Sequence, residues 1–268
     1  MDKILAIVVA YNPDIEELKG NLDSYAPYVE RTLLWCNSPF ALDYPNVELC
    51  GDGTNRGIPE ALNYAWHYAE ENGYQWLLTM DQDSKWENFS DFRDLALSGL
   101  VPEGIYTPRI FEQEVSGDFI PTNELITSGT LQSIRDVRAA GGWGTDFFLD
   151  AVDVDFHIRA LRAGIKVYKL GKGHLIHHMG DVVVKKFLGK PYTTVNYSPK
   201  RLYGIYRNHW IVIRRYPEFA QHVKAETLHS YSFRIPRIIL GEKDKFKKIW
   251  AIFKGTVAGL TYKINQDV

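Results

Sequence analysis

The chain has 268 residues, of which 45% are hydrophobic and 24% are charged. This composition can bury a large core and excludes a disordered protein. The net charge of −2 hides an asymmetry, because residues 200–268 carry 14 Lys and Arg against 5 Asp and Glu, and the remainder is acidic. A basic tail suggests contact with phosphates or an anionic membrane surface, and a solvated helix face is the alternative.

Cysteine usage and hydropathy indicate the compartment. Cys36 and Cys50 lie in separate apolar runs, without the spacing of a disulfide framework or a zinc site, so we expect reduced thiols in a cytoplasmic protein. The apolar stretch at the start is short and is followed at once by polar residues, which predicts a first strand and not a signal peptide. No run of eighteen apolar residues is present, so no membrane span is predicted.

The first eighty residues alternate strand and helix patterns. Four apolar runs predict strands buried on both faces, at residues 3–10, 31–37, 47–51 and 74–80. Helices are predicted after Asn12 and Pro13, and from residue 58 to Gly73. This order predicts an open, largely parallel α/β sheet with helices on both faces, whose ligands bind at the carboxyl ends of the strands.

The middle of the chain is less regular. Strands are predicted at 104–111 and 124–134, helices at 134–144 and from about 150 to 164, and short strands at 165–170 and 174–180. After about residue 196 the chain becomes helical and basic. We therefore expect a catalytic domain over 1–198 and a helical, basic extension over 199–268.

The segment Asp81-Gln82-Asp83 follows the fourth predicted strand. Side chains at i and i+2 of an extended segment lie on the same side, so Asp81 and Asp83 can share one cation. Oxygen ligands favour Mg²⁺ or Mn²⁺, which could hold a nucleotide diphosphate. The alternative is an aspartate turn that caps a helix starting within residues 84–92.

Three later clusters carry similar alternatives. Asp150, Asp153 and Asp155 either cap a helix or supply a general base. A histidine among His174, His177 and His178 could complete a metal site. Arg201, Arg207 and Asn208 lie near one another on a predicted helix and could contact a diphosphate or an acceptor, the alternative being surface charge.

The order of these segments is more specific than any one of them. It runs "VVAYNP", "NRGIPEALN", "TMDQDS", "TSGT", "FLDAVDVDF", "HHMG" and "RLYGIYRN". The set resembles the family 2 glycosyltransferases, most closely their rhamnosyltransferase-like branch, over about residues 3–210. The resemblance implies the GT-A fold and inverting transfer of a rhamnose, galactose or glucose-class sugar from a UDP or dTDP donor, with Mg²⁺ or Mn²⁺.

The resemblance also implies residue roles. Asp81, Asp83 and His177 match the metal site, with His178 as the competing register, and Asp153 matches the general base, with Asp155 as its acidic companion. The nucleotide-contacting positions are Ala10, Tyr11, Asn12, Asn37, Arg56, Gly57 and Asp81. Two positions depart from the pattern: Cys36 replaces an Asp that pairs with the base, and Val152 replaces a Glu, although a "VD" pair is usual in this branch.

Three other functions fit the sequence less well. A haloacid-dehalogenase-type phosphatase would carry its DxD on the first strand, and a sugar nucleotidyltransferase would need a glycine-rich loop after that strand, which "AYNPDIEE" does not provide. A non-catalytic nucleotide-sugar-binding homologue would keep the fold without turnover. We expect no nucleic-acid partner.

The last forty residues contain an amphipathic pattern. Apolar residues recur at helical spacing, namely Phe246, Ile249, Trp250, Phe253, Val257, Leu260 and Ile264, among five lysines. Such a helix could lie in an anionic membrane surface or pack on the catalytic domain. The family resemblance implies a lipid-diphosphate-linked glycan acceptor in bacterial surface polysaccharide assembly, including O-antigen, and hence a place at the inner face of the cell membrane.

Overall fold

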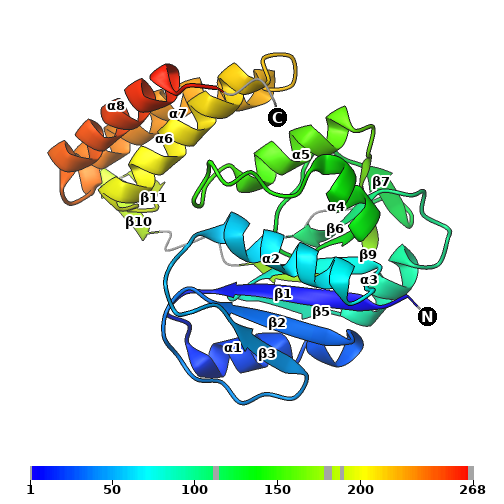
Figure 1. Cartoon of the computed structure of the whole chain (residues 1–268). Coiled ribbons are helices and arrows are strands. Elements are labelled where there is room, and N and C mark those ends of the chain that lie inside the picture. The colour runs from blue at the N-terminus through cyan, green and yellow to red at the C-terminus, as the bar shows by residue number, and fades with distance from the viewer. Residues whose placement is uncertain (1, 111–114, 178–182, 188–189, 265–268) are drawn as a thin grey trace. The chain divides into compact units, whose positions relative to one another are not determined.

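The computed structural model describes residues 2–110, 115–177, 183–187 and 190–264, and it consists of two compact units. Unit 1 comprises Met1–Phe148 with Val152–His178, and unit 2 comprises Leu149–Ala151 with Met179–Val268. The two units are described separately below, with the element labels of Figure 1.

Unit 1 is built on one mixed sheet with the order β3-β2-β1-β4-β8-β6-β9-β5, and β7 pairs with β9. The parallel half consists of β1 (Ile4–Ala10), β2 (Arg31–Cys36), β3 (Val47–Cys50) and β4 (Trp76–Asp81). The remaining strands are β5 (Ser84–Glu87), β6 (Ile105–Ile110), β7 (Phe119–Pro121), β8 (Thr130–Ser133) and β9 (Val167–His177). Of these, only β6 and β9 pair in parallel, and β5, β7 and β8 are antiparallel to their partners. The predicted α/β sheet is therefore confirmed.

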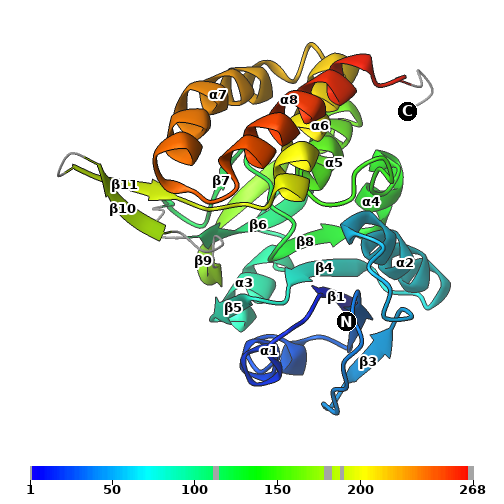
Figure 2. The same cartoon turned by 90° about the vertical axis from the view of Figure 1, so that its left-hand side faces the viewer.

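Helices cover both faces of this sheet (Figures 1 and 2). They are α1 (Ile15–Leu22), α2 (Ile58–Glu71), α3 (Phe89–Ala96), α4 (Ile134–Ala140) and α5 (Val152–Arg162), with a short 3₁₀ turn at Ala26–Tyr28. On one face, Ala6 and Val8 of β1 share a core with Leu22 of α1 and Phe92 of α3. Helix α2 packs against β1 and β4 from the other face. Alternating side chains of the buried strands supply both cores.

Several predicted elements differ from the structure. Residues 84–92 do not start a helix directly: they form β5 and the beginning of α3. The two strands predicted at 165–170 and 174–180 are one continuous strand, β9, as far as His177, and residues 178–180 lie outside the described part. Of the strand predicted at 124–134, only the last part, β8, is extended. Strand β7 and the hairpin of unit 2 were not predicted.

Unit 2 contains three helices and a hairpin: α6 (Pro199–Arg215), α7 (Gln221–Gly241), α8 (Lys245–Thr261), β10 (Val183–Phe187) and β11 (Lys190–Thr194). Its core is formed by Leu202, Tyr206, Ile238 and Ile252 with their neighbours. The helical C-terminal region predicted from the sequence is confirmed. The residue pair 198 and 199, predicted as a domain boundary, lies at the start of α6 within this unit.

Candidate functional site

The parallel strands bring the predicted segments to one edge of the sheet. Val9 of β1 lies opposite Asp81 of β4, and Ala10 lies opposite Cys36 of β2. The segments that follow these strands, beginning with Tyr11, Asn37 and Gln82, therefore leave the sheet at the same edge.

Three potential metal ligands meet at this edge. One ligand atom each of Asp81, Asp83 and His177 lies within 4.8 Å of the others. His177 ends β9 directly opposite Ser84 of β5, and the Ser84 hydroxyl is 2.8 Å from His177 Nδ1. Two carboxylates and an imidazole suit Mn²⁺, and the oxygen donors also suit Mg²⁺. The competing residue His178 lies outside the described residues.

The electrostatics of Asp81 fit a cation at this place. Burial, together with the negative charges of Asp83 and Asp153, raises the pKa of Asp81 to about 7. A nearby positive charge would favour the ionised carboxylate and reverse this shift. The contribution of Asp153 to this pKa means that its carboxylate lies close enough to Asp81 for their charges to interact.

The three aspartates around the start of α5 have different surroundings. Asp155 is fully buried and forms an ion pair of 2.8 Å with Arg159, whose guanidinium also donates to the carbonyls of Ala140 and Gly142. Asp150, in the segment that precedes α5, accepts from Arg201 at 3.4 Å within unit 2. The pKa of Asp150 is raised because burial outweighs the effect of that arginine. Asp153 is the one that faces the acidic cluster of Asp81.

The two loops after β1 and β4 are tied together by Gln82. Its side chain accepts from the amide of Tyr11 at 2.6 Å and donates to the carbonyl of Tyr11 at 3.3 Å. The Tyr11 ring is 53% exposed, so it can contact a ligand at this edge. Asn12 has a positive φ of 47°, which asparagine tolerates. Its backbone amide donates to the hydroxyl of Ser38.

Asn37 lies at the predicted position, but its side chain forms hydrogen bonds to other residues of the protein. Its side-chain oxygen accepts from the Trp35 indole and from the amide of Arg56, and its amide group donates to the carbonyl of Gly57. Asn37 therefore shapes the loop before α2. Arg56 forms a half-exposed ion pair of 2.7 Å with Asp52, which holds the pKa of that carboxyl at about 2.

Gly57 precedes α2 in a conformation reserved for glycine. Its φ is +85°, and a Cβ added there would lie 2.5 Å from the carbonyl oxygen of Phe148. That carbonyl accepts from the amide of Ile58, the first residue of α2. The loop and the start of α2 are thus held against the segment that leads to Asp153.

The three predicted residues of α6 belong to unit 2, and two of them contact Asp150. The Asn208 amide donates to the carbonyl of Asp150 at 2.7 Å, and the Arg207 guanidinium donates to Asn208 at 2.8 Å. Arg201 stacks over the ring of Tyr197 at 4.3 Å and pairs with Asp150. Unit 2 thereby brings these residues to the segment 149–151.

Sequence reasoning missed the supporting residues. Neither Gln82 nor Ser84 is among the site residues predicted from the sequence. Ser128, fully buried in "TSGT", accepts from the amide of Asp81 at 3.0 Å. The presence of "TSGT" among the family-like segments was the only signal for that contact.

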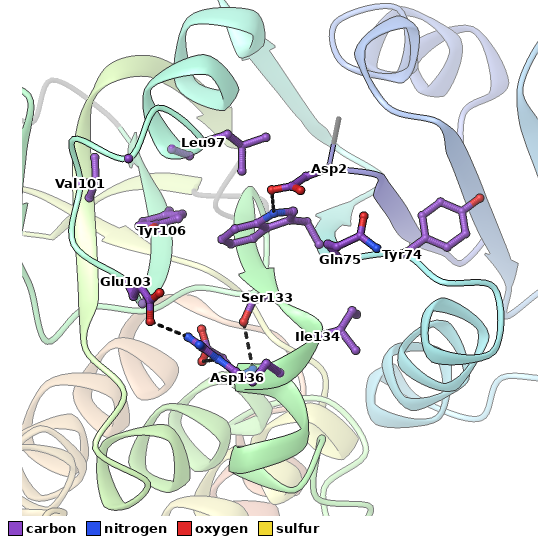
Figure 3. Close-up of a pocket in the computed structure, with 15 residues that line it drawn as sticks. Asp2, Tyr74, Gln75, Leu97, Val101, Glu103, Tyr106, Ser133, Ile134 and Asp136 are labelled. Atoms are coloured by element: carbon purple, nitrogen blue, oxygen red, sulfur yellow. Dashed lines mark hydrogen bonds and ion pairs between the residues drawn. The ribbon is translucent and has the colours of Figure 1, made fainter.

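A cavity of about 510 Å³ lies elsewhere in unit 1, at the amino ends of β4 and β6 (Figure 3). Its Trp76 indole stacks on Tyr106 with 5.7 Å between centroids and donates to Asp2. At its rim Arg135 pairs with Glu103 at 2.9 Å. The polar side chains named here pair with each other and do not converge on the cavity, so this place lacks the chemistry of the edge described above.

Comparison with known proteins shows what the whole chain is similar to. No family model matches the chain. The dTDP-rhamnosyl transferase RfbF of Shigella flexneri is 25% identical over 244 residues, which cover 79% of this chain and 80% of that protein. The relationship by sequence is therefore to a sugar transferase.

Solved structures show the same fold. S. aureus TarS in complex with UDP-GlcNAc has a TM-score of 0.58 at 15% identity and covers 96% of this chain and 81% of its own. GalNAc-T7 with UDP, GalNAc and Mn²⁺ has a TM-score of 0.55 at 10% identity and covers 83% of this chain, which spans about half of GalNAc-T7.

The chain therefore has the GT-A fold of the glycosyltransferases. The sequence relative reported above is a dTDP-rhamnosyl transferase. The resemblance seen in the sequence is confirmed. The alternative of a haloacid-dehalogenase-type phosphatase does not agree with this fold, because here the two aspartates lie at the end of β4 and not of the first strand.

Proposed function

We propose that the protein is an inverting, metal-dependent glycosyltransferase. It moves a rhamnose, galactose or glucose-class sugar from a UDP or dTDP donor to a hydroxyl of a glycan acceptor. The observation that carries the proposal is the cluster of Asp81, Asp83 and His177 with Asp153 beside it, at the carboxyl edge of the parallel strands. A donor of the dTDP type is suggested by the name of the sequence relative.

In this proposal the loops after β1 and β2 hold the nucleoside. Tyr11 offers an exposed ring for stacking, and the backbone of Ala10 to Asn12 borders the ligand. Asn37 acts indirectly, by fixing Arg56 and Gly57 in the loop before α2. Cys36 precedes this loop and is buried, and its thiol takes the place of the carboxylate that would pair with the base.

Asp81, Asp83 and His177 would hold the cation. When bound, Mg²⁺ or Mn²⁺ would neutralise the charge that develops on the diphosphate leaving group. Asp153 takes the proton of the acceptor hydroxyl as its oxygen bonds to the anomeric carbon, while the bond from that carbon to the diphosphate breaks on the opposite face. One displacement of this kind inverts the anomeric configuration and needs one catalytic carboxylate.

The acceptor side of the proposal rests on the sequence resemblance. Arg201, Arg207 and Asn208 are proposed to contact the diphosphate or the acceptor, as a guanidinium can bind phosphate through two hydrogen bonds. A lipid-diphosphate-linked glycan is the proposed acceptor, with the enzyme in the cytoplasm at the inner face of the cell membrane.

The first test concerns the metal. We expect UDP or dTDP to bind with Mn²⁺ present and much more weakly in EDTA, because Asp81 and Asp83 repel a diphosphate unless a cation lies between them. Calorimetry measures both affinities. Asp83→Ala should reduce the metal-dependent binding at least ~10-fold, whereas the exposed control Asp43→Ala should not. Equal nucleotide affinity with and without EDTA would contradict the metal role.

The second test separates the catalytic aspartate from its neighbour. Asp153→Asn should fold and bind donor but lose turnover by ~10²–10⁴-fold, the usual contribution of a positioned base. Asp155→Asn should instead lower the free energy of unfolding by about 3 kcal/mol, because it leaves the Arg159 charge buried without its partner. Nucleotide release from a panel of nucleotide sugars and urea unfolding measure the two effects. An Asp153→Asn variant that unfolds yet keeps its specific activity would make Asp153 a helix-terminal residue only.

A further inference from the structure

One face of α8 is apolar and exposed. Its side chains recur at steps of three and four residues, so they form one stripe along the helix. Their exposed fractions are 91% for Phe246, 58% for Trp250, 55% for Phe253, 43% for Val257 and 44% for Leu260. Two of the rings, Trp250 and Phe253, stack with 5.3 Å between their centroids. We refer to these five residues as the apolar stripe of α8.

The opposite face of α8 is fixed on α6. Gly255 and Gly259 contact the backbone of α6 so closely that an added Cβ would lie 2.4 Å from the carbonyl oxygen of Tyr203 and 2.5 Å from that of Arg207. Ile252 lies in the core of unit 2 on the same side. This packing keeps the apolar stripe on the side of α8 that does not contact α6.

The charges that α8 itself places around the apolar stripe are all positive. Helix α8 contains four lysines and no acidic residue. By helical spacing, Lys247 and Lys254 border one side of the stripe and Lys245 the other, and all three are exposed. The fourth, Lys248, is buried on the α6 side and pairs with Glu242 at 2.7 Å. The border of the stripe is thus positive, apart from Asp244, which pairs with Lys247.

We propose that the apolar stripe of α8 inserts into the surface of an anionic bilayer, with Lys245, Lys247 and Lys254 contacting lipid phosphates. An amphipathic helix with aromatic residues on one face and lysines at its border lies in the plane of such a surface. The lysine side chains reach the headgroups while their methylene stems cover apolar surface. Among the described residues, no helix combines the length and apolar character needed to cross a bilayer.

A second copy of the chain fits this surface less well. Two stripes packed face to face would bring the lysine borders of both copies together, and like charges across an interface are unfavourable. An anionic bilayer offers the opposite charge and an apolar layer at the same time. The charge of the border therefore favours lipid over self-association.

Vesicle co-sedimentation of the full chain, without nucleotide or metal, tests the proposal. We expect binding to vesicles of 30% phosphatidylglycerol in phosphatidylcholine, weak binding to phosphatidylcholine alone, and weaker binding at high salt. Each lysine near such a surface contributes about 1 kcal/mol, which is about fivefold in partitioning. Lys245→Gln/Lys247→Gln/Lys254→Gln should therefore reduce partitioning about 100-fold. The matched change of three exposed lysines in unit 1, Lys3, Lys166 and Lys172, should have no effect.

A second pair of variants tests the apolar part. Phe246→Gln/Phe253→Gln should reduce partitioning at least ~10-fold. The control Leu100→Gln/Leu228→Gln, at residues 71% and 51% exposed, should not. Equal binding of both pairs, or no binding of the folded wild type, would overturn the proposal. The stripe would instead belong to an interface with a second copy if two results were found together. The wild type would not bind vesicles, and it would form a dimer in sedimentation velocity that the Phe246→Gln/Phe253→Gln change abolishes. Since no donor is present, failure here leaves the proposed transferase activity untouched.

Discussion

Ser84 is the residue whose role at the site most depends on the tertiary structure. It is fully buried, and its hydroxyl contacts His177 Nδ1 at 2.8 Å. Such a contact fixes the ring orientation, and we expect the cation to bind the other ring nitrogen, Nε2. Ser84→Ala should therefore weaken Mn²⁺ binding about 10- to 100-fold. Calorimetry with Mn²⁺ alone measures this, with Ser98→Ala as a control. Unchanged Mn²⁺ affinity in a folded Ser84→Ala protein would contradict a positioning role.

His209 gives unit 2 a pH-dependent stability. Burial, with a smaller effect of the Arg234 charge, lowers the pKa of His209 to about 4. The unfolded chain therefore binds a proton below about pH 6.5 while the folded chain does not. Stability is fully present above pH 6.5 and falls as the pH drops towards 4. At pH 5 the loss relative to pH 7 amounts to about 2 kcal/mol.

Urea unfolding of the wild type and of His209→Gln at pH 7 and pH 5 checks this difference. The variant should show about 2 kcal/mol less loss of unfolding free energy on acidification than the wild type. His222→Gln, at an exposed position on α7, should behave like the wild type. An identical pH response of the His209 variant and the wild type would show that His209 is accessible to protons in the folded state.

The candidate metal residues could be predicted from the sequence because the pattern is local. Asp81 ends the buried strand β4 and Asp83 follows at i+2, whereas His177, at the end of β9 opposite Ser84 of β5, is indicated by the family resemblance. The partners of Asn37 and Asp155 could not be predicted, since they depend on residues brought together only by the fold. Arg159 is four residues from Asp155, a spacing that equally fits an exposed helix pair.

Two glycines of the chain offer a matched comparison at the level of the helix. Gly255 of α8 lies against the backbone of α6, whereas Gly20 of α1 has nothing within 4 Å of an added Cβ. Gly255→Ala should lower the free energy of unfolding by about 1–3 kcal/mol through overpacking. Gly20→Ala should raise it by up to ~1 kcal/mol, because alanine is the better helix former. Thermal or urea unfolding of the two variants measures both signs. A stabilised Gly255→Ala protein would show that α8 can move away from α6, which would also weaken the membrane proposal.

Most elements of the parallel half could be predicted, since a continuous apolar run of five to eight residues has few other structures available. The predictions are wrong where a segment is a strand only because it pairs with another strand. Residues 84–87 have a strand pattern too short to recognise, and they are extended because they pair with β9 from Ser84 to Glu87. Strand β9 contains Gly171 and Gly173 between the two strands predicted from the sequence, and at Gly173 an added Cβ would lie 2.5 Å from Phe92.

The whole molecule combines an acidic part with a basic one, as the sequence indicated. Every candidate nucleotide and metal residue lies in unit 1, while the exposed apolar stripe of α8 lies in unit 2. Donor chemistry and the proposed surface contact are therefore assigned to different units of the fold. Arg201, Arg207 and Asn208 are the exceptions, because they belong to unit 2 and are proposed to contact the diphosphate or the acceptor.

Hydrogen exchange of the intact protein can test this division of roles. A ligand that binds only the folded state slows exchange where it stabilises the backbone. Adding UDP or dTDP with Mn²⁺ should protect the segments after β1, β2 and β4, at residues 10–12, 37–57 and 81–84. Helices α7 and α8 should exchange as before and serve as the internal reference. Protection of the first turns of α6 is the further result expected from the proposed role of Arg201 and Arg207. Protection confined to unit 1 would indicate that Arg201 and Arg207, with their partners Asp150 and Asn208, have a structural role only. Absence of protection at residues 81–84 would show that the donor does not bind at this edge of the sheet.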